Sequence, residues 1–325
     1  MSVSTPANSQ NIIRQFLYAQ ELQARLRDWL IGRPLFNDRT AEFGDGDELT
    51  ITQIGQRALK DHLDGSAIDF TKIDTSRIVL KVTEAYEDGF AVTDDLKEDS
   101  HQFAAYWAKN VDESGLAFER QLESDVLAVA NQQTANDPNL INGQAHRRVA
   151  GSGGTAGIIT IEDFNRMKLA FDKARVPVEN RVAIVDPKVE FELNQLIDQT
   201  AVTNGSTFNY DFQGLVQEGF GDRLNIVRNI MGFNIIISHN LPDVGAETID
   251  AGDGTGSLAV NDGVANIFMS MASSDAMPFM GVMRRMPDPE MFRNVNLRQD
   301  EWTATARWGF AIQRPETLGV ILTEK

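Results

Sequence analysis

The sequence of 325 residues contains no cysteine. Without thiols, the chain cannot form a disulfide scaffold, a thiol nucleophile or a thiolate metal site. It also lacks any apolar run near the ~20 residues that a membrane-spanning helix needs. Its polar N-terminus does not show the basic-then-apolar order of a secretory signal. These absences predict a protein that is made in a cytoplasm and has no membrane partner.

Basic residues are scarce, because 30 Lys and Arg face 47 Asp and Glu, for a formal net charge of −17. Binding to a phosphate backbone depends on clustered Lys and Arg. The composition therefore argues against nucleic-acid recognition. Acidic side chains crowd residues 84–99, and we interpret them either as a solvated surface or as one that must not adhere to nucleic acid.

Residues with catalytic or metal-binding chemistry are few and scattered. The four histidines are isolated, so neither a zinc site nor a histidine-based triad is predicted. The glycine-rich segment 151–157 lacks the Lys-Ser/Thr ending of a phosphate loop, and we interpret it as a flexible hinge. Segment 250–256 lacks the third acidic ligand and the terminal Glu of a calcium loop, which favours a surface turn. We predict no active site, no metal and no cofactor.

A period of two residues marks the end of the chain. Its apolar positions are Trp302, Ala304, Ala306, Trp308, Phe310 and Ile312. This period predicts a strand with one buried face. Arg314-Pro315 ends the run, because proline has no N–H for a ladder and keeps its predecessor extended, and a second short strand is predicted at 318–322. The other face is expected to be a contact surface, formed by Thr303, Thr305, Arg307 and Gln313.

Residues 100–133 carry the longest helical pattern. Apolar side chains recur mostly every three or four positions, at Phe103, Trp107, Val111, Phe118, Leu122, Val126 and Val129. A helix of this length extends ~45 Å. We expect it to lie against the apolar face of the strand at 302–312, with Phe118 and Leu122 in the core. Glu119 and Glu123, one turn apart, are interpreted as its polar face.

The other segments mix helices and strands without a repeated βαβ rhythm, which predicts an α+β fold. An amphipathic helix is expected at 8–31 and an irregular extended linker at 36–43. Short strands at 49–52, 68–71 and 78–83 carry too few core residues for their length, so we expect a hairpin excursion over 47–95 that is buried by something else.

Residues 158–286 form a second expected unit. Thr160 and Asp163 resemble a capping box, and Asp186-Pro187 is a typical helix start. Strands are expected at 181–185, 224–227, 233–237 and 267–271, and a Gly/Asp loop at 249–258. His146, Arg147 and Arg148 form a small basic cluster that we place in a loop, where a surface contact is plausible.

The order of these parts resembles the major capsid protein family of tailed bacteriophages, whose fold is shared with encapsulins and the herpesvirus capsid floor. The resemblance is carried by three segments, 182–187 (VAIVDP), 232–242 (GFNIIISHNLP) and 308–316 (WGFAIQRPE). It implies a phage major-capsid-type fold in five parts: an N-terminal arm (1–46), an extension loop formed by a β-hairpin (47–99), the peripheral domain with its spine helix and the following loop (100–157), an axial domain (158–286) and the C-terminal strands of the peripheral domain (287–325).

The resemblance also implies a structural protein without enzymatic activity. Copies of it would assemble as hexamers and pentamers into the icosahedral head of a virion, in the host cytoplasm, and enclose double-stranded DNA without sequence-specific binding. Because no long helical segment precedes residue 8, a separate scaffolding protein is expected, with a portal and a decoration protein as further partners. The candidate subunit contacts are Trp29, Ile51, Phe70, Arg77, His146, Arg147, Arg148 and Arg307.

Two other functions stay open at the level of sequence. An encapsulin-like nanocompartment shell would share the fold and enclose enzymes. A soluble α+β enzyme would assemble its active site from scattered residues.

Overall fold

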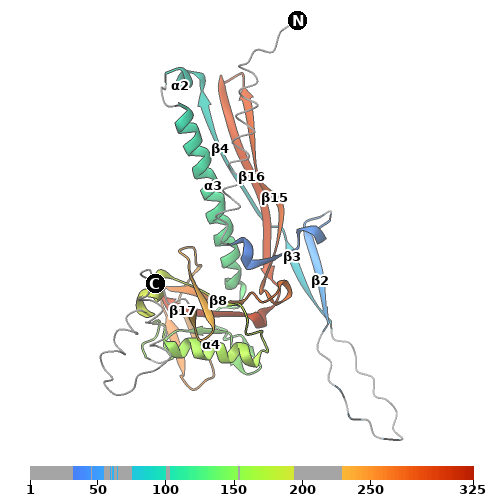
Figure 1. Cartoon of the computed structure of the whole chain (residues 1–325), viewed down its shortest axis with the longest axis vertical. Coiled ribbons are helices and arrows are strands. Elements are labelled where there is room, and N and C mark those ends of the chain that lie inside the picture. Colours follow the sequence, from blue (N-terminus) through green and yellow to red (C-terminus); the bar gives the residue numbers. More distant parts are fainter. Residues whose placement is uncertain are drawn as a thin grey trace.

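A computed structural model describes residues 32–44, 46–54, 75–99, 103–152, 154–193 and 229–325, together with residues 59, 61 and 64. The helix expected at 8–31 and the strands expected at 68–71 and 224–227 lie outside the described residues. Figure 1 shows a long sheet with a helix beside it, standing on a second, compact body.

The long sheet has four strands in the order β1-β15-β16-β4. These are β1 (Phe36–Asp38), β15 (Phe279–Asn294), β16 (Gln299–Ile312) and β4 (Glu84–Thr93). β1 is parallel to β15, and the other two pairings are antiparallel. The linker expected at 36–43 is therefore wrong in part, because β1 joins the sheet and Phe36 is buried in the core.

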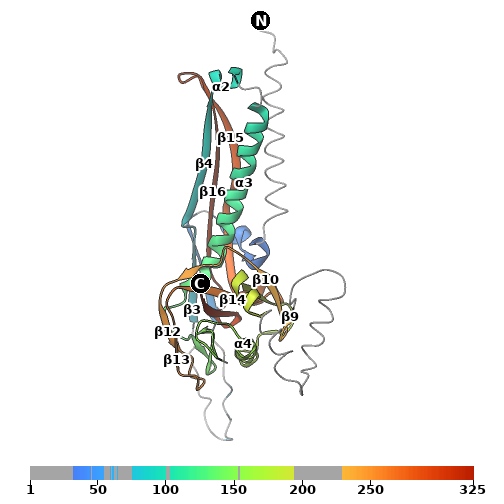
Figure 2. The same ribbon diagram turned by 90° about the vertical axis from the view of Figure 1, so that its left-hand side faces the viewer.

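Helix α3 (Phe103–Ala128) runs along one face of this sheet, as Figure 2 shows. The apolar positions that alternate along β16 form that face, since its side chains are buried at Trp302, Ala304, Ala306 and Trp308. Phe118 and Leu122 of α3 belong to the same core cluster. The predicted packing of the long helix against this strand is confirmed. The α-helix ends at Ala128, earlier than expected, and the chain continues as η3 (Val129–Gln132).

The compact body is built on a seven-stranded sheet, with main order β7-β17-β14-β8-β10-β9, to which β11 is added beside β14. Its strands are β7 (Arg147–Val149), β17 (Leu318–Glu324), β14 (Gly263–Ser270), β8 (Arg181–Val185), β10 (Phe233–Ile237), β9 (Asn229–Ile230) and β11 (Asp243–Val244). The strand predictions at 181–185, 233–237 and 267–271 are confirmed. The assignment of β17 to the sheet of the long strands is wrong, because β17 pairs with β14 and β7.

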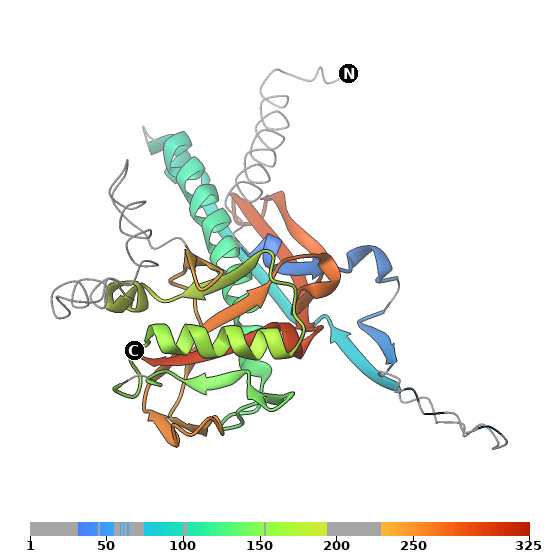
Figure 3. The same ribbon diagram turned by 60° about the horizontal axis from the view of Figure 1, so that its bottom comes forward.

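The seven-stranded sheet is covered on both faces. In β8, Val182 and Ile184 join the cluster of α3, while Ala183 and Val185 join the cluster of α4 (Ile161–Lys173). Figure 3 shows α4 lying across the sheet. Burial on two faces explains why β8 is apolar without alternation. Residues 187–193 are helical, as the Asp-Pro start predicts.

The excursion is a hairpin of β2 (Glu48–Ile54) and β3 (Thr75–Lys81), paired from Glu48–Lys81 to Ile54–Thr75. The hairpin prediction is confirmed for these strands. The predicted ends of the excursion at residue 95 and of the extension loop at residue 99 are wrong, because β4 pairs along its whole length with β16 and so belongs to the long sheet. After β4, helix α2 (Asp94–Asp99) leads toward α3.

Smaller elements complete the fold. They are β5 (Leu140–Ile141), β6 (Gln144–Ala145), β12 (Glu247–Asp250), β13 (Ser257–Val260), and the 3-10 helices η1 (Arg33–Leu35), η2 (Thr40–Glu42), η4 (Ser274–Ala276) and η5 (Pro315–Thr317). β12 and β13 form a hairpin, so the loop predicted at 249–258 is confined to the turn between them.

Candidate inter-subunit surfaces

The base of the β2–β3 hairpin is packed against its own subunit. Leu49, Ile51 and Ile78 pack on a small core cluster that includes Leu80 and Met280. A Cβ added at Gly309 of β16 would collide with the backbone of Lys81, which shows how closely the two strands approach. The base of this excursion is therefore covered in part by its own subunit, and its further burial by neighbouring copies stays a prediction.

The candidate contacts on this hairpin have different environments. Ile51 is partly buried at the base and faces the subunit core. Arg77 is exposed on β3. Phe70 lies outside the described residues, as does Trp29, which is a candidate contact of the expected N-terminal arm and not of the hairpin. Arg77 is thus the one member of this group whose described side chain is available to a neighbour.

The outer face of the long sheet, opposite α3, is polar. Arg307 of β16 lies directly opposite Arg285 of β15, and both side chains are exposed. Like charges directly opposite each other destabilise a sheet, so an incoming anionic group would relieve this pair. Gln313, expected on the same surface, is buried instead, where it accepts a hydrogen bond from Asn37 Nδ2 at 3.1 Å. Arg285 was missed because its strand was not predicted.

A half-buried carboxylate joins α3 to the long sheet. Asp125 of α3 accepts hydrogen bonds from Trp308 Nε1 and Gln121 Nε2, each at 2.8 Å. Gln121 also donates to the hydroxyl of Tyr86 on β4 at 3.2 Å. Burial raises the pKa of Asp125, and the negative charge of Glu84 raises it further. The hydrogen bonds that Asp125 accepts lower the pKa, but by less than burial raises it. The polar face predicted around Glu119 is wrong at that residue, which is buried.

This carboxylate makes stability depend on pH. Because the folded pKa lies above 3.8, the ordinary value for an aspartate, the folded state binds more protons in the window just above pH 3.8. The contribution of Asp125 to the free energy of unfolding is therefore full below that pH and lost as pH rises through the folded pKa. Asp125→Asn keeps an acceptor for Trp308 and cannot ionise.

We expect the advantage of Asp125→Asn over wild type, measured as the thermal unfolding midpoint of the unassembled subunit, to grow from pH 4 to pH 7. Asp125→Leu serves as the control for the lost acceptor, because it leaves Trp308 Nε1 unpaired and should be about 1–3 kcal/mol less stable than Asp125→Asn at every pH. A pH-independent difference between the Asn variant and wild type would contradict the assigned pKa shift.

The basic cluster at 146–148 is buried within the subunit. His146, Arg147 and Arg148 are at most 3% exposed, and the last two belong to β7 rather than to a loop. Burial lowers the pKa of His146. The prediction that these residues form a surface contact is wrong, because acidic side chains distant in sequence neutralise both arginines inside the fold.

Arg147 forms a bidentate ion pair with Glu247 of β12, with Nη2–Oε1 at 2.6 Å and Nε–Oε2 at 3.1 Å. Both side chains are almost fully buried. Removing one partner of such a pair leaves a buried charge without compensation, which typically costs about 3–5 kcal/mol. The pair fixes the β12–β13 hairpin against β7.

Arg147→Met should therefore lower the free energy of unfolding by about 3–5 kcal/mol, whereas Arg147→Met combined with Glu247→Leu should recover most of the loss. Chemical denaturation of the unassembled subunits measures both values. Lys81→Ala is the matched control, since its ion pair with Glu48 is exposed and is worth less than about 1 kcal/mol. A double variant as unstable as the single one would contradict this account of the pair.

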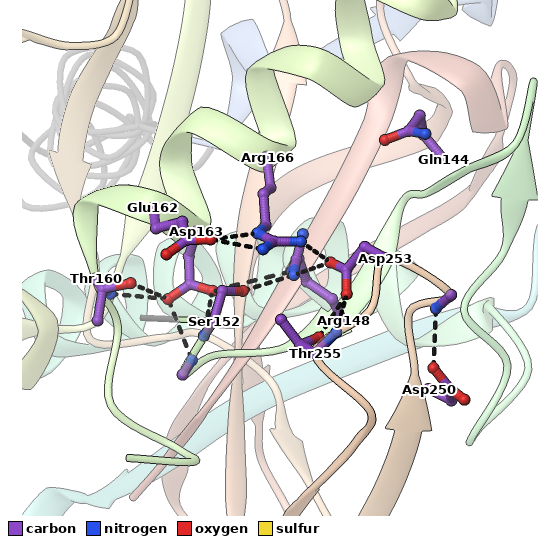
Figure 4. Close-up of polar contacts among 12 residues, drawn as sticks. Gln144, Arg148, Ser152, Thr160, Glu162, Asp163, Arg166, Asp250, Asp253 and Thr255 are labelled. Atoms are coloured by element: carbon purple, nitrogen blue, oxygen red, sulfur yellow. Dashed lines mark hydrogen bonds and ion pairs between the residues drawn. The ribbon is translucent and has the colours of Figure 1, made fainter. Parts of the chain in front are cut away.

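Arg148 belongs to a polar network shown in Figure 4. Its Nη2 donates to Asp253 Oδ2 at 2.7 Å and to Ser152 Oγ at 2.6 Å. Arg166 Nη1 lies 2.6 Å from the same Asp253 oxygen. Partial burial opposes ionisation of Asp253, yet hydrogen bonds from Thr255 and the charge of Arg148 hold its pKa well below its usual value. The turn predicted at 250–256 is thus confirmed, and it is anchored to α4 and β7.

The glycine-rich segment is anchored as well. The backbone N–H groups of Gly151 and Ser152 donate to Asp163 at 3.1 Å. Thr160 donates to the same carboxylate through its N–H at 2.9 Å and its hydroxyl at 2.8 Å, which confirms the predicted helix start. Gly157 N–H donates to Ala150 O at 2.9 Å. The hinge prediction is wrong, because one carboxylate holds both the turn and the first residues of α4.

Two other kinds of site are absent from the described part of the chain. No group of three or more His, Cys, Asp or Glu side chains could hold a metal ion there. In the same residues, no helix has both the length and the apolar character needed to cross a bilayer.

A long sheet with a helix along one face, a hairpin leading away from its base and a compact α+β body together define a viral shell subunit. Residues 79–321 match the family model described as phage capsid protein. The chain belongs to this family and is a capsid shell protein. No match was found among curated proteins.

Solved structures show the same fold at low sequence identity. The capsid of cyanophage P-SCSP1u has a TM-score of 0.61 and 15% identity, and the match covers 91% of this chain and 88% of that chain. The mature capsid of bacteriophage PhiM1 has a TM-score of 0.59 and 11% identity, and the match covers 91% of this chain and 87% of that chain. The SrpI encapsulin complex of Synechococcus elongatus PCC 7942 has a TM-score of 0.51 and 11% identity, and the match covers 88% of this chain and 84% of that chain. The predicted α+β capsid-type fold is confirmed.

Proposed function

We propose that this chain is the principal subunit of an icosahedral phage head, and that its copies assemble as hexamers and pentamers around double-stranded DNA. The observation that carries the proposal is the β2–β3 hairpin, whose base is fixed to its own subunit and whose strands lead away from the long sheet (Figure 1). Extended elements of this kind add contact area that a compact body cannot supply.

A ring of identical subunits needs two different surfaces that fit each other. The hairpin with Arg77 is one candidate surface, and the outer face of the long sheet with Arg307 and Arg285 is another, to be met by an anionic group of a neighbour. Both carry exposed side chains. We therefore keep Arg77 and Arg307 as contact residues and no longer propose His146, Arg147 or Arg148.

The strand pairings support a revised division of the chain. We propose an arm up to residue 46, an extension loop at 47–81, a peripheral domain formed by β4, α3, β15 and β16, and an axial domain formed by the seven-stranded sheet and α4. The net charge of −17 supports enclosure of DNA without tight binding to it. A separate scaffolding protein, a portal and a decoration protein are the expected partners, with assembly in the host cytoplasm.

Shell proteins of this family act by self-association, so we propose no catalytic activity. The encapsulin-like alternative is less supported, because the family match is to phage capsid proteins. Purified chain, expressed alone and with its neighbouring scaffold gene, should sediment as particles far larger than the 36.0 kDa subunit. A stable monomer under both conditions would contradict the proposal.

A further inference from the structure

His146 lies where several elements of the compact body meet, and its side chain is fully buried. Its backbone N–H donates to Pro138 O at 3.1 Å, just before the β5–β6 hairpin, and its carbonyl accepts a hydrogen bond from Val320 of β17 at 2.7 Å. The imidazole stacks on the ring of Phe171 in α4, with centroids 6.0 Å apart and planes at 17°. One titratable side chain therefore joins α4, the β5–β6 hairpin and the strand that follows η5.

The hydrogen bonding around the imidazole suits a neutral ring. Nδ1 lies 3.2 Å from the carbonyl oxygen of Gln144. Nε2 is buried and has no hydrogen-bond partner among the described residues. A neutral imidazole has one N–H donor, and Gln144 can accept it, whereas the protonated ring has two donors. Protonation would therefore add a buried donor and a positive charge at the same place.

The charged groups around the ring are already paired. Glu316 of η5 is 38% exposed and lies 3.5 Å from Arg314. The guanidinium of Arg181 lies over the same phenyl ring that the imidazole stacks on, and it pairs with Asp172 at 2.7 Å. The β5–β6 hairpin and residues 318–322 of β17 carry no charge. In the described part of the chain, a protonated imidazole would thus be a buried cation without an ion pair, which is costly.

We propose that His146 is an acid-sensitive switch: when its ring takes up a proton, residues 313–320 separate from α4 and the ring reaches water. We call these residues the β16–β17 corner, because they contain η5 and carry the chain from the long sheet into the compact body (Figure 1). The opening is local, since the shared core of α3 with both sheets does not include His146. The inference concerns the subunit itself and does not depend on shell assembly.

The direction of the pH dependence follows from burial. Burial lowers the pKa of His146 below its ordinary value of 6.5, and the backbone of Gln144 together with the backbone and charge of Glu316 offsets only part of this effect. The unfolded or opened state then binds more protons. The contribution of His146 to stability is full above pH 6.5 and is lost as pH falls from 6.5 through the folded pKa. Asp125 acts with the opposite sign, so the two groups can be separated.

Hydrogen exchange of the unassembled full-length subunit tests the switch. Exchange is followed by mass spectrometry at pH 7.5, 6.5 and 5.5, and each rate is corrected for the pH dependence of intrinsic exchange. Because opening is coupled to one proton, the equilibrium constant for opening of the β16–β17 corner should rise by as much as about tenfold per pH unit below 6.5. Equal protection of the corner in wild type at pH 7.5 and 5.5 would overturn the proposal.

Two variants separate His146 from other titrating groups. His146→Asn can still donate to the carbonyl of Gln144 but cannot take up a proton, so protection of its corner should not depend on pH. His239→Asn is the matched control, because His239 is an exposed residue of the compact body, and it should keep the wild-type pH dependence. The same loss of protection in His146→Asn as in wild type would contradict the assignment.

A second measurement needs no variant. Wild-type subunit with carbon-13 in its four histidine rings is titrated by NMR over the same pH range. One ring should stay neutral below pH 6.5 and take up its proton as protection of the corner is lost. If all four rings are protonated at or above pH 6.5, the proposal is wrong even where His146→Asn does not fold. Neither result bears on whether the chain forms shells.

Discussion

Deletion of residues 53–76, with Thr52 joined to Arg77 through an Asn-Gly turn, is expected to give a folded subunit that cannot form closed shells. The cut keeps Leu49, Ile51 and Ile78, which pack at the hairpin base. It also keeps β4, which pairs with β16. An Asn-Gly turn suits a two-residue hairpin connection. The deletion leaves Arg77 at the new turn and removes the part of the excursion beyond it, which the proposed function requires for contact with neighbouring copies.

The contrast with a longer deletion makes this result specific. Removal of residues 47–95 also removes β4 and with it the ring contact of Phe90 with Trp107, at 4.7 Å between centroids. That variant should fail to fold, and so could not report on assembly. Circular dichroism and electron microscopy of both variants separate the two effects. Normal shells from the 53–76 deletion would refute the role of the hairpin.

Phe118→Asp is expected to prevent folding of the subunit. Phe118 is 4% exposed in the core between α3 and the long sheet. An unpaired carboxylate there would lose its hydration and leave the space of an aromatic ring partly empty, and phenylalanine truncation alone typically costs about 3–5 kcal/mol. A loss of this size approaches the whole stability of an ordinary domain, about 5–15 kcal/mol.

Ala117→Asp is the matched control, because Ala117 is the preceding residue of the same helix and is exposed. It should change the melting midpoint little. Thermal unfolding followed by circular dichroism compares the two variants directly. Full thermal stability of Phe118→Asp would contradict the placement of α3 against β16.

The packing of α3 against β16 was predictable because each segment carries its own periodicity. Trp302 to Trp308 alternate at every second residue, and Trp107 to Val126 recur at helical spacing. Both periods survive in the structure, since one face of each element is buried in a shared core. The start of helix α4 was also predictable from local sequence, as the hydrogen bonds between Thr160 and Asp163 show.

Strands whose sequences do not alternate between apolar and polar residues were not predicted. β15 contains Pro287 and Pro289 and several charged residues, so its sequence does not resemble a central strand. The structure explains the prolines, because β1 pairs only with residues 279–281 and the rest of that edge has no described strand beside it. β4 was obscured by its acidic outer positions. β17 was found as a strand, but a short apolar run does not reveal which sheet it will join.

The prediction of surface contacts was wrong for residues that are buried by partners distant in sequence. Arg147 and Arg148 look like surface residues in a polar loop, yet each meets a carboxylate more than 90 residues away in sequence, at Glu247 and Asp253. Nothing in the local pattern points to those partners. The exposure of Arg307 was predictable because its strand alternates, which fixes the side of the sheet on which it lies, and its role as a subunit contact stays a prediction.

The most direct test of the account is a cryo-electron microscopy reconstruction of particles formed by the full-length chain with its scaffold partner. We predict a closed icosahedral shell of hexamers and pentamers, with a neighbouring copy contacting Arg307 on the outer face of the long sheet and the hairpin bearing Arg77 reaching an adjacent subunit. Particles without icosahedral order, or a shell in which the β2–β3 hairpin touches no other copy, would contradict it.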